Sequence, residues 1–131
     1  LLEYKHHLQH NAYILKHAEL PGFSQPDRQL LVALVSLYQG DINISYIEQQ
    51  SATSPENAIK LLIILRLAVI LCGRRNGDEL PEYQISAHQN ALEISLPTAW
   101  LAQHALISDE LQQENTFIAP LGYSLAVISH G

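Results

Sequence analysis

The chain has 131 residues, of which 47% are hydrophobic and 15% are charged. These values exclude a disordered or collagen-like chain, and the length is that of a single region with its own core. Seven Lys and Arg against thirteen Asp and Glu give a net charge of −6. We therefore expect no independent binding of nucleic acid, which needs a basic surface. Because residue 1 is Leu rather than Met, we expect a piece of a longer protein.

Two helices are predicted at the start of the chain. Apolar residues at helical spacing predict a helix over residues 1–19, which Pro21 and Gly22 end. Ser24 is the predicted N-cap of a second helix that runs to about Tyr38.

The most apolar helix follows a short amphipathic stretch at residues 45–50. Ser54 and Pro55 form a strong helix start, and the helix is predicted to run to about residue 74. Its apolar run is too short to span a bilayer, so we expect a core helix and no membrane contact. Cys72, the only cysteine, is expected to be a buried structural thiol.

After this helix, the apolar residues are no longer spaced as in a helix but alternate with polar residues. Residues 83–88 and 92–96 alternate around Gln89 and Asn90, which predicts a hairpin. A helical turn at residues 99–104, a helix at 108–118 and a third strand near 123–129 are predicted after it. The fold class is therefore α+β: three to four helices, followed by a small antiparallel sheet with a crossing helix. We place the boundary between a helical portion, residues 1–77, and a small α+β unit, residues 78–131.

Three histidines, His6, His10 and His17, share one face of the first predicted helix. That face is either a polar or interdomain surface or a contact with a metal or anion, and His6 with His10 has the spacing of a chelating pair. No His-Asp dipeptide, phosphate-binding glycine loop or nucleophile turn occurs. We therefore assign no catalytic residue and no metal ligand to this chain.

Three arginines are the candidate substrate-binding residues. Arg66 interrupts the apolar helix, and a guanidinium buried there must be paired. The alternatives are a structural ion pair with Asp or Glu, or an interdomain or phosphate contact. Arg74 and Arg75 follow at the end of the same helix, where they either complement the helix dipole or meet a phosphate.

With these segments in place, the chain resembles the C-terminal part of the exopolyphosphatase / guanosine pentaphosphate phosphatase family. The resemblance extends in order over nearly the whole chain. It rests on residues 10–15 (HNAYIL), 20–24 (LPGFS), 65–68 (LRLA), 95–97 (SLP), 100–101 (WL) and 122–123 (GY). Residues 49–52 (QQSA), 73–75 (GRR) and 80–82 (LPE) are closer to the guanosine pentaphosphate branch.

The resemblance implies a hydrolase. We expect it to be cytoplasmic, because a lone cysteine fits a reducing compartment, and to form a homodimer, because the chain is rich in apolar residues. Its N-terminal pair of actin-like ATPase-type domains would carry the catalytic glutamate and bind Mg²⁺. Residues 1–77 would be the C-terminal part of an HD-like helical domain. The enzyme would remove the terminal phosphate of guanosine 5′-triphosphate 3′-diphosphate or of polyphosphate, by attack of an activated water.

On that basis this chain would be a non-catalytic region that serves domain packing, dimerisation and binding of the substrate end through Arg66, Arg74 and Arg75. The exopolyphosphatase branch carries Tyr-His-Arg where this chain has Leu37-Tyr38-Gln39. That difference and the acidity of the chain favour the guanosine substrate over a long polyanion. The alternative is a stand-alone regulatory or binding module without hydrolase activity.

Overall fold

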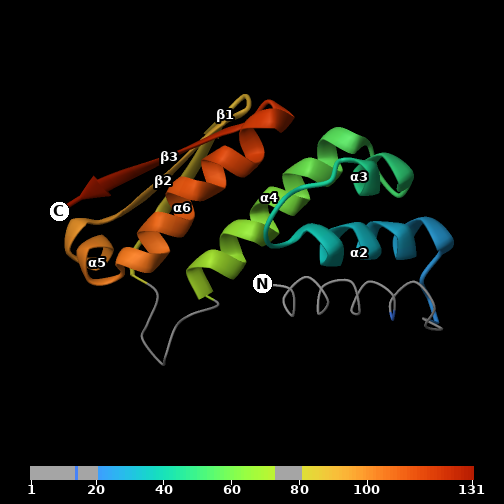
Figure 1. The fold of residues 1–131 in the computed structure, drawn as a ribbon, viewed down its shortest axis with the longest axis horizontal. Helices are drawn as coiled ribbons and strands as arrows, with labels where there is room; N and C mark the ends of the chain where they lie inside the picture. The colour runs from blue at the N-terminus through green and yellow to red at the C-terminus, as the bar shows by residue number, and fades with distance from the viewer. Residues whose placement is uncertain (1–13, 15–20, 73–80) are drawn as a thin grey trace. The chain divides into compact units, whose positions relative to one another are not determined.

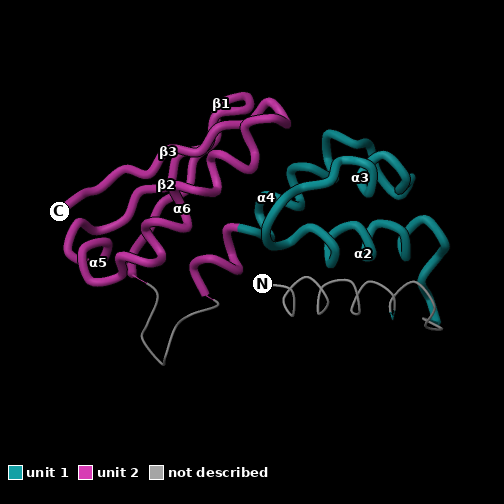
Figure 2. The backbone as a smooth tube through the Cα atoms, in the orientation of Figure 1, with its two compact units in different colours: residues 1–66 teal, residues 67–131 magenta. Residues whose placement is uncertain are grey.

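The computed structural model describes residue 14, residues 21–72 and residues 81–131. The chain divides into two compact units, residues 1–66 and residues 67–131 (Figure 2). The predicted helix over residues 1–19 and the predicted boundary after residue 77 fall outside the described residues, so both stay predictions. None of the helices in the described ranges is long and apolar enough to cross a membrane.

The described part of the first unit is helical (Figure 1). It contains α2 (Gln25–Leu37), α3 (Ser45–Gln49) and the first part of α4 (Pro55–Cys72). Their apolar sides share one core, because each helix turns a stripe of nonpolar residues inward. The buried members of this core are Ala33, Leu37, Ile47, Ala58 and Leu62.

The predicted helix starts are confirmed by side-chain caps. Ser24 Oγ accepts a hydrogen bond from the backbone N–H of Asp27 at 3.2 Å. A cap of this kind satisfies one of the four N–H groups that a helix start leaves without an internal partner.

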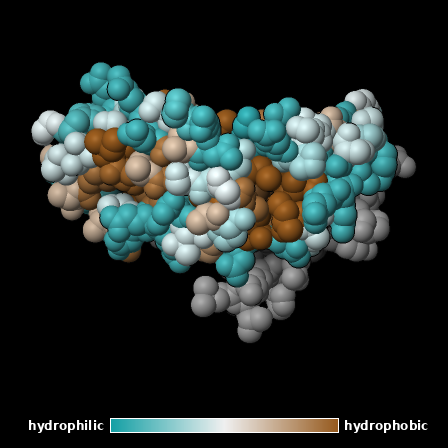
Figure 3. Space-filling view, turned by 90° about the horizontal axis from the view of Figure 1, so that it is seen from above, coloured by the Kyte–Doolittle hydropathy of each residue, from teal (hydrophilic) through white to brown (hydrophobic). Residues whose placement is uncertain are grey.

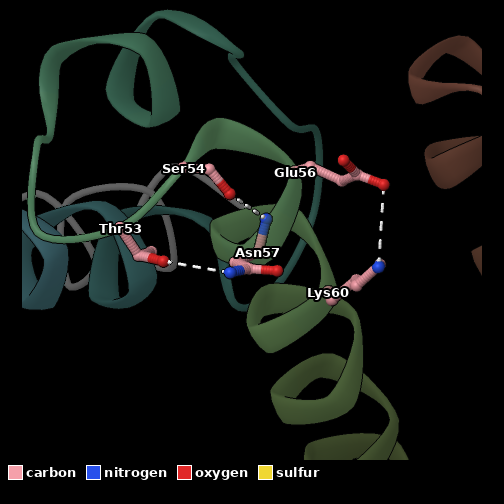
Figure 4. Close-up of polar contacts among 5 residues, drawn as sticks. All are labelled: Thr53, Ser54, Glu56, Asn57 and Lys60. Carbon is pink, nitrogen blue, oxygen red and sulfur yellow. Dashed lines mark hydrogen bonds and ion pairs between the residues drawn. The ribbon is translucent and has the colours of Figure 1, made fainter.

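The start of α4 is shown in Figure 4. Ser54 Oγ accepts from the backbone N–H of Asn57 at 3.1 Å, and the Asn57 side-chain amide donates to Thr53 Oγ1 at 3.3 Å. Glu56 and Lys60 form an ion pair at 3.6 Å, one helical turn apart. The solvent-facing polar groups of α4 thus gather in its first two turns.

The second unit carries a three-stranded sheet in the order β1-β2-β3. The strands are β1 (Gln84–His88), β2 (Ala91–Pro97) and β3 (Ser124–His130). The predicted hairpin is confirmed: β1 and β2 pair antiparallel, and Gln89 takes a positive φ of 55° in the two-residue turn.

The α+β class is confirmed, but the prediction of a wholly antiparallel sheet is wrong for β3. β3 runs parallel to β2, with Leu92 opposite Leu125 and Ile94 opposite Val127. Two α-helices, α5 (Thr98–Gln103) and α6 (Ala105–Ile118), and the short 3-10 helix η1 (Ala119–Leu121) lie between these strands. They return the chain to the end of the sheet at which β2 begins. A parallel pair of strands needs a crossover connection of this length.

Helix α6 packs along β3 and covers one face of the sheet (Figure 1). Side chains alternate between the two faces of a strand, so Ile94, Leu96 and Leu125 are buried while Glu93 and Ala126 are exposed. Ile107, Leu111 and Ile118 are the buried residues that α6 adds to this unit besides Glu114.

Cys72 is exposed, so the expectation of a buried thiol is wrong. Leu67, Ile70 and Leu71 are the buried residues of this end of α4. Neighbouring helical positions differ by about 100°, so a residue that follows Leu71 points away from the side on which these three lie.

Candidate functional sites: the buried arginine and the open face of the sheet

Arg66 is the largest fully buried side chain that the structure describes, with 2% of its surface exposed. Its guanidinium donates two hydrogen bonds to main-chain oxygens of the same unit. Nη1 donates to the carbonyl of Leu37, and Nη2 donates to the carbonyl of Gly40 at 2.8 Å. The guanidinium therefore binds the carbonyl of the last residue of α2 and a carbonyl of the turn that follows it.

The local conformation explains why those carbonyls face Arg66. Helix α2 ends at Leu37, and Gly40 takes a left-handed φ of 75° that turns the chain away from the helix axis. The last carbonyls of a helix lack internal partners and carry partial negative charge. A guanidinium offers several N–H donors in a rigid fork, so it can bind two such oxygens at once.

The other predicted site residues lie outside the described residues. These are Arg74 and Arg75, and the histidines His6, His10 and His17, to which we assign no ligand, lie outside the described residues as well. In residues 21–72 and 81–131, no group of three or more His, Cys, Asp or Glu is placed so that it could hold a metal ion. A phosphate contact by any of the three arginines stays a prediction.

One polar pair on the open face of the sheet was not predicted from the sequence. Ser95 Oγ lies 2.6 Å from Nδ1 of His130, and Thr98 Oγ1 donates to the backbone carbonyl of His130 at 3.3 Å. Pairing of β3 with β2 places His130 opposite Pro97, two residues beyond Ser95. The pair is exposed, and it links the end of β3 to β2 and to the start of α5.

Charge is distributed unevenly along the chain. Residues 76–131 contain no Lys or Arg, and they contain seven Asp and Glu. Five of the seven lie among the described residues, at Glu82, Glu93, Asp109, Glu110 and Glu114. Glu82, Glu93 and Asp109 are exposed, and exposed carboxylates repel phosphate anions unless histidines or main-chain donors offset them. Arg74 and Arg75 are the last two cations before this acidic stretch.

Comparison with known proteins identifies the family to which the chain is similar. The family described as "Ppx/GppA phosphatase, domain III" matches residues 1–115. Three relatives carry the name guanosine-5′-triphosphate,3′-diphosphate pyrophosphatase. The one from Pseudoalteromonas translucida is 41% identical over 127 residues, and the one from Photobacterium profundum is 36% identical over 126 residues. The one from Aeromonas hydrophila subsp. hydrophila is 38% identical over 113 residues.

These matches cover 97%, 96% and 86% of this chain, but only 25%, 25% and 23% of the relatives. The chain thus spans about a quarter of the length of the curated relatives it matches. The resemblance found in the sequence is confirmed on both counts, since the family matches most of the chain and the relatives extend well beyond it. The chain belongs to the Ppx/GppA phosphatase family, in the part described as its domain III.

Proposed function

We propose that this chain is the C-terminal, non-catalytic region of a cytoplasmic phosphatase that acts on guanosine 5′-triphosphate 3′-diphosphate. The observation that carries the proposal is the match of residues 1–115 to domain III of a phosphatase family. The relatives are named for this guanosine substrate, and the chain accounts for about a quarter of their length. Polyphosphate is the alternative substrate, and a comparison of phosphate release from the two compounds distinguishes them.

In this proposal, the remaining three-quarters of the polypeptide catalyses the reaction. The actin-like ATPase-type domains there would supply the general base and bind Mg²⁺, which lowers the barrier by offsetting charge on the phosphoryl oxygens. Residues 21–72 and 81–131 do not contain a group of three or more His, Cys, Asp or Glu that could hold a metal ion.

The charged residues of this chain are consistent with the proposed non-catalytic role. Arg66 is buried and binds the carbonyls of Leu37 and Gly40, so its position serves the fold of the helical unit. Arg74 and Arg75 are adjacent cations that follow α4, and they remain the residues proposed to bind the phosphate end of the substrate. Domain packing and dimerisation are the other proposed roles.

The test is phosphate release by the full-length polypeptide and by this 131-residue chain, with each substrate in turn. We expect the full-length protein to release phosphate from the guanosine substrate faster than from polyphosphate, and the chain alone to release none. Turnover by the chain alone would contradict the division of labour. Failure of the full-length protein on both substrates would instead favour a regulatory or binding module.

A double variant of the full-length protein tests whether Arg74 and Arg75 bind the substrate. Replacing Arg74 and Arg75 together by Ala removes two cations from the stretch that follows α4 in the sequence. If they bind the substrate end in the ground and transition states alike, KM rises while kcat changes little. An unchanged KM would remove both residues from the proposed site.

A further inference from the structure

One side of α4 in the first unit is apolar and exposed. Ile64 is 62% exposed and Leu61 is 46% exposed, one helical turn apart. Their immediate neighbours Leu62 and Ile63 are buried. The five residues 61–65 are all Leu or Ile, so no charged or amide group interrupts this surface between Lys60 and Arg66. Figure 3 shows hydrophobic residues gathered in patches at the surface among hydrophilic ones.

A helix that is hydrophobic on all sides is normally surrounded by protein. The first two turns of α4 are instead amphipathic, because the polar residues Glu56, Asn57 and Lys60 are exposed there. From Leu61 onward the exposed side has the composition of a core. A single exposed leucine needs no explanation, but adjacent large aliphatic residues on one side of a core helix indicate a contact surface.

We propose that the exposed side of α4 at Leu61 and Ile64 docks against an apolar surface in the part of the same polypeptide that lies outside this chain. The inference rests on the proposed function, in which this chain is one region of a longer phosphatase. Its relatives are about four times as long as the matched region, so most of their polypeptide is available to cover the helix. A tethered segment of the same chain is present at high effective concentration, which favours it over a second copy.

The first measurement asks whether the surface is covered. In the full-length protein, Ile64→Cys and Leu106→Cys are made separately and labelled with a thiol reagent. Leu106 is the matched control, because it is 67% exposed and lies in the mostly polar helix α6. Trypsin releases residues 61–66 as one peptide, free of Cys72, and residues 76–131 contain no Lys or Arg, so the two positions are read separately.

We expect labelling at position 64 to be slower than at position 106 by about tenfold or more, because reaction must await local opening of the contact. Equal labelling rates at the two positions would overturn the proposal. Phosphate release by each variant shows that it is folded. It also separates the two claims, since an active full-length protein with a freely labelled position 64 retains the proposed function and loses this inference.

The second measurement identifies what covers the surface. A photoreactive phenylalanine analogue replaces Ile64 in the full-length protein, and the captured peptide is identified by mass spectrometry. We expect an intramolecular cross-link to a peptide outside residues 1–131, with a yield that does not fall on dilution. A cross-link to residues 1–20, or one between two copies that disappears on dilution, would assign the surface to another occupant and overturn the proposal.

Discussion

Replacing Arg66 by Met is expected to destabilise the helical unit by about 2–4 kcal/mol. The substitution removes the two hydrogen bonds to the carbonyls of Leu37 and Gly40, and a hydrogen bond from a charged donor is worth about 1.5–3 kcal/mol. Part of this loss is offset because methionine does not carry a charge that must be desolvated. Met also fills a similar volume, which limits any cavity.

Two controls separate hydrogen bonding from charge and from volume. Arg66→Lys keeps the charge but replaces the planar fork by a point donor, so we expect about half the loss seen with Met. Lys60→Met removes an exposed cation from the same helix and should change stability by no more than about 0.5 kcal/mol.

The measurement is urea unfolding followed by circular dichroism, with hydrogen exchange of the α2 amides as a local readout. In Arg66→Met, exchange should accelerate first in the last turn of α2, where Leu37 loses its partner. A stability within about 0.5 kcal/mol of the parent, together with unchanged α2 exchange, would refute the assignment of Arg66 as the group that holds this helix end.

Two further predictions concern the sheet unit, and both are read by the same unfolding assay. Leu111→Ala should cost about 2–5 kcal/mol because Leu111 is fully buried, whereas Leu106→Ala at the exposed start of α6 should be near neutral. Asn115→Ala should cost about 1–2 kcal/mol, since Asn115 Oδ1 accepts from the backbone N–H of Leu125 at 2.9 Å. Gln112→Ala, exposed on the same helix, is its control, and equal effects of the two would contradict that role.

Features set by neighbours in the chain were predictable. Ser24 and Ser54 cap helices through bonds to residues three positions ahead, so the signal lies within one short segment. The hairpin at Gln89 and Asn90 is equally local, since two alternating runs flank a two-residue turn. In these cases the interacting groups are close in sequence, and the residue types that form the interaction are few.

Features set by distant partners were not predictable. Alternation identifies a strand, but it is the same for parallel and antiparallel neighbours, so the direction of β3 depended on the helices that precede it. The contact between Ser95 and His130 follows from that direction, because only the parallel register brings His130 next to the end of β2. The need of Arg66 for a partner was visible in the sequence, but the carbonyls of Leu37 and Gly40 carry no sequence signal of their own.

The position of Arg66 also bears on what the helical unit contributes to an enzyme of this family. A guanidinium that binds two carbonyls of the polypeptide fixes the end of α2 against α4. The same guanidinium would lose both hydrogen bonds if it moved to meet a phosphate, and the buried carbonyl of Leu37 and the partly buried carbonyl of Gly40 would lose that donor. These two hydrogen bonds thus make α2 and α4 more rigid relative to each other. A rigid α4 is what the docking surface at Leu61 and Ile64 requires, because an apolar contact is maintained only if its side chains keep their relative positions.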